Sequence, residues 1–123
     1  MDYRWEVMRA HSALVRAMPK GREVLAELLS EDFEGQINTH RYETDGFLDA
    51  LDRICEHYPD YGAFANRKVY EPSVSQAGVL VVRYYITIKG GGAFCEDRVQ
   101  LDDSGKICWY HHRDLTIAPV VLG

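Results

Sequence analysis

The sequence predicts one α+β domain, in which three amphipathic helices pack on a strongly curved, mainly antiparallel sheet. Apolar residues recur at helical spacing three times in the first half of the chain and alternate at strand spacing in the second half. Glycine-rich and acidic turns separate the extended segments. The 123 residues, 46% of them hydrophobic, suffice for a single core. We therefore expect residues 1–123 to form one cone-shaped α+β roll around an interior pocket.

Each expected helix repeats apolar side chains on one face and ends at proline, glycine or a polar cluster. We expect helices over residues 3–18, 24–29 and 45–58. The polar residues 30–32 should form a turn after the second helix, and a short strand should follow over 33–38. Thr44 or Asp45 can cap the third helix, and Pro59 prevents its continuation.

The second half of the chain is typical of a meander of extended segments. We expect strands over residues 67–75, 79–89, 94–101 and 106–117. Pro72 lacks an N–H, which confines the first of them to a sheet edge or a bulge. Hairpin turns are expected at Gly90–Gly92 and at residues 102–105. Such a sheet has one face to bury, and the helices are the elements that can cover it.

Charge and composition exclude several classes of partner. The formal net charge of −5, with basic residues scattered singly, provides no electrostatic footprint for nucleic acid. No apolar run reaches the roughly 20 residues that cross a membrane, and the first residues carry charges where a signal peptide is apolar. We therefore expect no nucleic-acid or membrane partner and a cytoplasmic location. Cys55, Cys95 and Cys108 form no CxxC pair and are expected to be reduced thiols without a metal.

Asp97 is a candidate catalytic residue because of its place in a strand. In the expected strand 94–101 it shares a face with Cys95, Val99 and Leu101. We therefore expect its carboxyl group to point into the core. Such a group is hydrogen-bonded, ion-paired, or neutral with a raised pKa, and the neutral form is a strong hydrogen-bond donor. A structural acid tied to a neighbouring group, or a bulge that turns the carboxyl group to water, would also fit.

The last expected strand alternates strictly between two sides. One side carries Cys108, Tyr110, His112 and Asp114, and the other carries Ile107, Trp109, His111, Arg113 and Leu115. Because His111 and His112 point to opposite faces, they do not converge on one ion, and we expect no metal site. If the Tyr110 side faces inward, it joins Asp97 on one wall, where His112 and Asp97 could transfer a proton. A hydrogen-bonded wall or a dimer interface explains these residues equally well.

Three further side chains are expected to line the pocket. His11 lies on the apolar stripe of the first helix, Trp5 precedes this stripe, and Tyr84 belongs to the inward, even-numbered side of strand 79–89. Trp5 would cover the open end of the cone. A lone histidine on an apolar stripe is more often a core residue than a catalyst, and packing at the sheet edge explains Trp5 equally well.

The order of elements and the closing sequence resemble one known superfamily. Helix, helix, short strand, helix and meander end with LDDSGKI at Leu101–Ile107, followed by Trp109 and Tyr110. Over nearly the whole chain this pattern resembles the nuclear transport factor 2-like superfamily. Its members include ketosteroid isomerases, scytalone dehydratase, SnoaL-type polyketide cyclases, limonene epoxide hydrolases and the noncatalytic β subunits of ring-hydroxylating dioxygenases. The resemblance implies a cone-shaped domain with a ligand-binding pocket that uses no metal or other cofactor.

The resemblance also implies roles for single positions. The turn that follows Asp97 places it where ketosteroid isomerases carry the protonated aspartate of their oxyanion hole. The general-base aspartate of that family falls within residues 36–38 and its helix-one tyrosine at Ala13 or Leu14, so neither is present. The closing-strand aspartate of limonene epoxide hydrolases coincides with His112. The remaining polar set implies lyase, cyclase or isomerase chemistry, with His112 as base and Asp97 as acid.

Two hypotheses of function follow. In the first, the chain is a cofactor-independent isomerase, dehydratase, cyclase or epoxide hydrolase that acts on a small apolar molecule in the cone. In the second, it is a noncatalytic ligand-binding or assembly domain that forms a homodimer through the outer face of its sheet. That face is expected to carry Arg83, Tyr85, Arg98 and Trp109. A cavity that holds the inward acid and histidine within hydrogen-bond reach would favour the first hypothesis.

Overall fold

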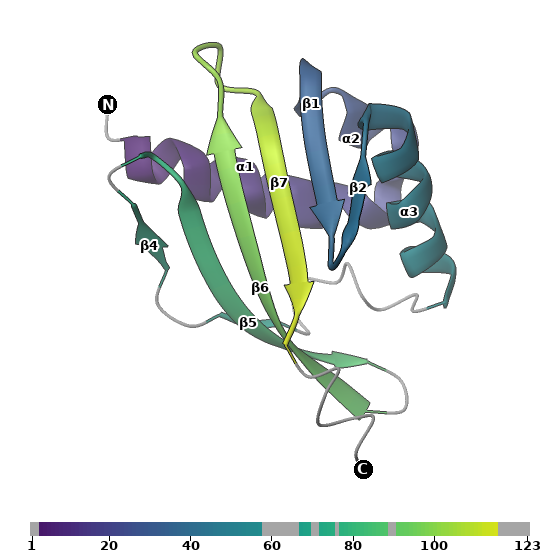
Figure 1. The fold of residues 1–123 in the computed structure, drawn as a ribbon. Coiled ribbons are helices and arrows are strands. Elements are labelled where there is room, and N and C mark those ends of the chain that lie inside the picture. Colours follow the sequence, from purple (N-terminus) through teal and green to yellow (C-terminus); the bar gives the residue numbers. More distant parts are fainter. Residues whose placement is uncertain (1–2, 58–66, 70–71, 76, 89–90, 116–123) are drawn as a thin grey trace.

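The computed structural model describes residues 3–57, 67–69, 72–75, 77–88 and 91–115. Within these ranges helices cover one face of a curved sheet, which confirms the expected α+β class (Figure 1). The helical elements are α1 (Tyr3–Ala17), a 3₁₀ turn (Met18–Lys20), α2 (Arg22–Ala26) and α3 (Thr44–His57). The strands are β1 (Leu29–Ile37), β2 (His40–Tyr42), β3 (Arg67–Val69), β4 (Ser73–Val74), β5 (Leu80–Ile88), β6 (Gly91–Leu101) and β7 (Ile107–Asp114).

The described strands form one mixed sheet. Its order is β2-β1-β7-β6-β5-β3, and β4 also pairs with β5. The pairing of β1 with β7 is parallel, whereas the other pairs among the described strands are antiparallel. The parallel pair places β1, from the first half of the chain, beside β7, the last described strand. Helix α1 crosses one face of the sheet and α3 lies beside β1 and β2 (Figure 1).

The core lies between the helices and the inner face of the sheet, which is the face that packs on them. On β5 the buried side chains are Leu80, Val82, Tyr84 and Ile86, which confirms the even-numbered side expected from the sequence. The largest fully buried helical side chains include Leu14, Leu25, Phe47 and Leu48. Burying one such side chain completely contributes about 1.5–3 kcal/mol relative to leaving it exposed.

Helices α1 and α3 match the sequence prediction closely. Helix α1 ends one residue earlier than expected, and α3 begins at Thr44. Pro59, which was expected to prevent continuation of the third helix, lies outside the described residues. None of the described helices is long and apolar enough to span a membrane.

The second helix and the first strand differ from the prediction. Helix α2 is shorter, and residues 29–32, expected as a helix end and a turn, belong to β1. Leu29 pairs with Ile107 at the start of β7, so a distant strand determines the local conformation. The sequence also missed β2, which pairs with β1 after Asn38 turns the chain with a φ of 55°.

A β-bulge corrects the side assigned to Ile107. Gln100 pairs with Trp109, but Leu101 pairs with Ile107, so β7 has one extra residue at Cys108. The extra residue breaks the alternation, and Ile107 is completely buried in the core, to which the side chain of Tyr110 also belongs. Strict alternation had placed these two side chains on opposite faces.

Three further boundaries differ or lie outside the described ranges. The strand expected over 67–75 is two short strands, β3 and β4, and residues 70–71 are not described. Gly91–Gly92, expected in a hairpin turn, begin β6, and Gly90 lies outside the described residues. Strand β7 ends before the expected end at residue 117, which also lies outside them.

Candidate functional site

The inner face of the sheet carries a buried acid, Asp97, within β6. As the sequence predicted, it shares this face with apolar neighbours, and it is 0% exposed. Its backbone pairs with Val82 of β5 on one side and with His112 of β7 on the other. Asp97 therefore lies in the interior of the sheet with a strand on either side of it.

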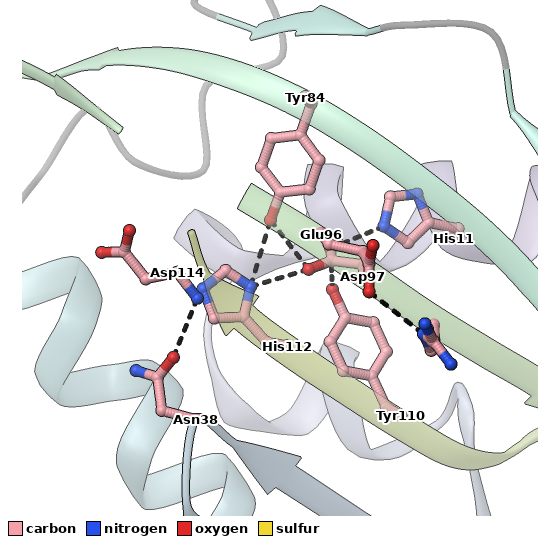
Figure 2. A network of polar contacts seen from close by, with 9 residues as sticks. His11, Asn38, Tyr84, Glu96, Asp97, Tyr110, His112 and Asp114 are labelled. Atoms are coloured by element: carbon pink, nitrogen blue, oxygen red, sulfur yellow. Dashed lines mark hydrogen bonds and ion pairs between the residues drawn. The ribbon is translucent and has the colours of Figure 1, made fainter. Parts of the chain in front are cut away.

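Four side chains meet the two oxygens of Asp97 (Figure 2). Oδ1 accepts a hydrogen bond from the hydroxyl group of Tyr84 at 2.9 Å and lies 2.7 Å from Nδ1 of His112. Oδ2 lies 2.8 Å from Nε2 of His11 and accepts a hydrogen bond from the hydroxyl group of Tyr110. Each oxygen thus has one imidazole and one phenol as partners. We call these five residues the Asp97 cluster.

Four elements supply the cluster. Helix α1 supplies His11, β5 supplies Tyr84, and β7 supplies Tyr110 and His112. The two flanking strands bring their side chains to Asp97 because β6 lies between them. The ring of His11 stacks on that of Tyr110, with ring centroids 6.1 Å apart and planes 12° apart. Packing of α1 on the sheet therefore supplies the one partner of Asp97 in the cluster that does not come from a strand.

The contacts favour an ionised Asp97. Complete burial raises the pKa of its carboxyl group, but the charge of His112 and the hydrogen bonds of His11 and His112 outweigh burial. They hold the pKa of Asp97 well below its usual range. A carboxylate has about four acceptor sites, and four neighbours occupy them. The ion-paired alternative is therefore favoured over the neutral acid with a raised pKa.

His112 carries the complementary charge. Burial lowers its pKa, but the charge and hydrogen bond of Asp97 outweigh burial and raise the pKa of His112 to about 10. The His112 side chain is 12% exposed, so it is less enclosed than its partner. His112 is accordingly an imidazolium at neutral pH. These charges reverse the roles expected from the sequence, because Asp97 accepts hydrogen bonds and His112 donates them.

The oxyanion-hole role implied by the resemblance needs a protonated carboxyl group that faces a ligand. Here the oxygens of Asp97 bond to protein groups on both sides, and the charge of the carboxyl group is negative. The residue of α1 that meets Asp97 is His11, two positions before Ala13. The site therefore differs from that of ketosteroid isomerases in charge and in its helical partner.

Two of the expected pocket residues, Asp114 and Trp5, are not among the five residues of the Asp97 cluster. The backbone N–H of Asp114 donates to Oδ1 of Asn38 at 2.8 Å, which ties the end of β7 to the residue after β1 (Figure 2). Trp5 is 62% exposed on α1. The structure thus brings together five of the seven candidate residues, and packing of the first helix on the sheet explains the inclusion of His11.

Four surface hollows lined by described residues lie away from the Asp97 cluster. Three of them are lined mainly by β1 together with β2, the start of α3 or the outer side of β6 and β7, and the fourth is lined mainly by α1 and the turn before β7. An enclosed pocket around Asp97 and His112 therefore stays a prediction. In the described part of the chain, no group of three or more histidine, cysteine or acidic side chains is placed to hold a metal ion.

Sequence reasoning missed a second buried acid, Glu96, on the outer face of the sheet. It is 2% exposed. Nε of Arg83 and Nε of Arg98 each donate to it at 3.0 Å, and Nη1 of Arg113 lies 3.7 Å away. Burial raises the pKa of Glu96, but the hydrogen bonds of Arg83 and Arg98 outweigh burial and lower it. We call these four residues the Glu96 cluster. Its presence could have been predicted only from the strand register, which pairs Arg83 and Arg113 with Glu96.

Comparisons with known proteins bear on the fold. No family model matches the chain, and no curated protein sequence matches it. Among solved structures, a de novo designed protein with a curved β-sheet is similar over 99% of this chain and 95% of its own, with a TM-score of 0.73 and 18% identity. A nuclear transport factor 2-like protein of unknown function from Cytophaga hutchinsonii is similar over 98% of this chain and 96% of its own (TM-score 0.66, 12% identity). A proposed polyketide cyclase from Sinorhizobium meliloti is similar over 78% of this chain and 85% of its own (TM-score 0.62, 14% identity).

Proposed function

From the nuclear transport factor 2-like fold, which this chain has, we propose that it binds a small, largely apolar molecule inside the cone. The solved structures that share the fold include a proposed polyketide cyclase, which supports a small-molecule site. Because one fold serves many functions, the ligand has to be argued from the site. In this proposal the Asp97 cluster is the polar end of the site, and His112 is the group that meets the ligand.

The observation that carries the proposal is the contact of Nδ1 of His112 with the completely buried carboxyl group of Asp97 at 2.7 Å, which favours the charged form of His112. An imidazolium in a water-poor site donates a strong hydrogen bond and stabilises negative charge on an oxygen atom. Asp97 has no proton to donate, because it is ionised and its acceptor sites are occupied. A ligand with a carbonyl or an anionic oxygen therefore suits the cluster better than a ligand with an ammonium group.

The same arrangement would support chemistry without a cofactor. Isomerisation, dehydration and cyclisation of a carbonyl compound all develop negative charge on an oxygen atom, which a fixed cation stabilises. With a pKa of about 10, His112 is better suited to this role than to that of a general base at neutral pH. Tyr84 and Tyr110 would hold Asp97 in place. Binding of the same ligands without turnover is the alternative.

A thermal-shift screen with cyclic ketones, enones and lactones tests the proposal. The proteins to compare are the wild type, His112→Gln, which loses the imidazole that meets the ligand, and His40→Gln, a matched control on the exposed strand β2. We expect some compounds to raise the Tm of the wild type and the control but not that of His112→Gln. Shifts that persist in His112→Gln would contradict the role of His112. Product analysis of the binding compounds by mass spectrometry then separates catalysis from binding.

A second candidate function, homodimer assembly, is favoured by the charge pattern of the outer face. The strand registers align outer-face residues of neighbouring strands in three rows. From β1 through β7 to β6, the first two rows are Glu34–Trp109–Gln100 and Gln36–His111–Arg98. From β7 through β6 to β5, the third row is Arg113–Glu96–Arg83. The acidic Glu34 lies in the first row, at one end of this face, and Arg113 and Arg83 lie in the third row, at the other end. Nε2 of His111, in the middle row, is buried and lacks a hydrogen-bond partner within the described residues. A two-fold axis between the two ends would bring the acidic end of each copy against the arginine end of the other.

Charge reversal tests this assembly. Size-exclusion chromatography with light scattering should give a dimer for the wild type at micromolar concentration. Arg113→Glu and Glu34→Arg should each be monomeric, whereas an equimolar mixture of the two should form a dimer, because each reversed charge meets an opposite one. Arg53→Glu on the exposed side of α3 is the control and should remain dimeric. A monomeric wild type, or two single variants that stay dimeric, would contradict the assembly.

A further inference from the structure

We propose that His11 is a positioning residue for His112, in that the two imidazoles compete across Asp97 for one dissociable proton, which His112 holds near neutral pH. The inference rests on the proposed function only in taking His112 as the group that meets the ligand. The competition for the proton is a property of the protein alone.

The first support is the symmetry of the Asp97 cluster. Oδ1 has His112 and Tyr84 as partners, and Oδ2 has His11 and Tyr110 (Figure 2). The two imidazole contacts are nearly equal in length, at 2.7 Å and 2.8 Å. Each histidine is therefore placed to serve as the cationic partner of the same carboxylate.

The second support is the balance of charge. The titratable groups that contact the two rings include Asp97 and Cys95 of β6, Tyr84 of β5 and Tyr110 of β7. Of these, only Asp97 is charged near pH 7, because thiols and phenols ionise at higher pH. One imidazolium thus neutralises the cluster. A second would add an uncompensated positive charge in a buried site, which is strongly unfavourable.

The surroundings favour His112 as the charged ring. Its Nδ1 lies within hydrogen-bond distance of both Asp97 and Tyr84, and its interaction with Cys95 also raises its pKa. His11 lies between α1 and the sheet and is 7% exposed. As a neutral ring that donates its Nε2–H, His11 meets Asp97 without burying a second charge.

His11 would then act on the ligand through Asp97. Its hydrogen bond withdraws negative charge from the carboxylate, so His112 holds its proton less tightly than it would beside a carboxylate without this donor. When His112 cannot hold the proton, His11 is the ring that receives it. A ligand with an anionic oxygen would stabilise the proton on His112. The proposed site should therefore bind ligands with an anionic oxygen more tightly than cationic ligands.

Imidazole ¹⁵N chemical shifts at pH 7 test the proposal, since they distinguish a charged ring from each neutral tautomer. In the wild type we expect a charged His112 and a neutral His11 protonated at Nε2. In His112→Gln we expect His11 to become charged, and in the control His40→Gln we expect no change. Two charged or two neutral rings in the wild type would overturn the proposal, as would a neutral His11 in a folded His112→Gln.

A second variant keeps the test decisive if His112→Gln does not fold. His11→Phe retains a ring that can stack on Tyr110 but removes the donor to Asp97. We expect the pKa of His112 in this variant to rise by about half a unit or more. An unchanged or lower pKa would overturn the proposal, because a merely structural role of His11 predicts no such rise. No ligand enters these measurements, so their failure is distinguishable from a failure of the ligand screen.

Discussion

Two neighbouring residues of β6, Asp97 and Glu96, are both buried acids, yet they face opposite sides of the sheet and have different partners. The oxygens of Asp97 meet histidines and tyrosines, whereas those of Glu96 meet arginines that are themselves about half exposed. Histidine changes its charge near neutral pH, and arginine does not. The inner acid therefore belongs to a cluster that can respond to protons and ligands, and the outer acid belongs to one of constant charge.

The largest expected effect is the loss of stability when the inner acid, Asp97, is replaced. Replacing Asp97→Asn leaves the imidazolium of His112 without its counterion and places an amide N–H₂ group among hydrogen-bond donors. We expect the free energy of unfolding at pH 7 to fall by about 3–5 kcal/mol. Chemical denaturation followed by circular dichroism would measure it. Unchanged or higher stability would show instead that the carboxyl group is neutral in the folded protein.

The next effect is the pH dependence of the inner cluster. The folded pKa of His112, about 10, lies above its ordinary value of 6.5, so its stabilisation is complete below pH 6.5 and is lost as the pH rises toward 10. The folded pKa of Asp97 lies below its ordinary 3.8, so its stabilisation is complete above about pH 4 and is lost in acid. We expect the free energy of unfolding to be highest between about pH 4 and 6.5.

Denaturation curves at a series of pH values would measure this profile. In the double variant His11→Phe with His112→Gln, where neither imidazole remains beside Asp97, the fall between pH 6.5 and 10 should be smaller than in the wild type. A wild-type profile without a decline in this range would mean that His112 is not held as a cation, and the contrast between the two acids would disappear.

A smaller effect is expected on the outer face. Replacing Glu96→Gln removes the shared partner of the arginines, but water can reach their guanidinium groups. We expect a loss of about 1–3 kcal/mol in the free energy of unfolding, less than for Asp97→Asn. Arg113→Ala is the matched control. Since Arg113 lies 3.7 Å from Glu96 and is half exposed, we expect a loss below about 1 kcal/mol. Equal losses for the two acids would refute the comparison.

Strand periodicity predicted much of the candidate site correctly. It placed Tyr84 and Asp97 on the inner face because β5 and β6 alternate regularly over these positions. It also grouped Tyr110 with His112, since the bulge of β7 precedes both residues. The same reasoning was wrong for Ile107, which comes before the bulge, because an extra residue in one strand leaves little trace in the order of apolar and polar residues.

The sequence by itself determined the fold class and the inward side of the long strands, because apolar periodicity is set by local geometry. Only the tertiary structure decided the charge of the site. His11 and Asp97 are 86 positions apart, and their contact exists because α1 packs on the sheet. The burial of Glu96 depends in the same way on the register that gathers its arginines. Desolvation and Coulomb attraction follow distances in space, which the spacing of residues along a chain does not contain.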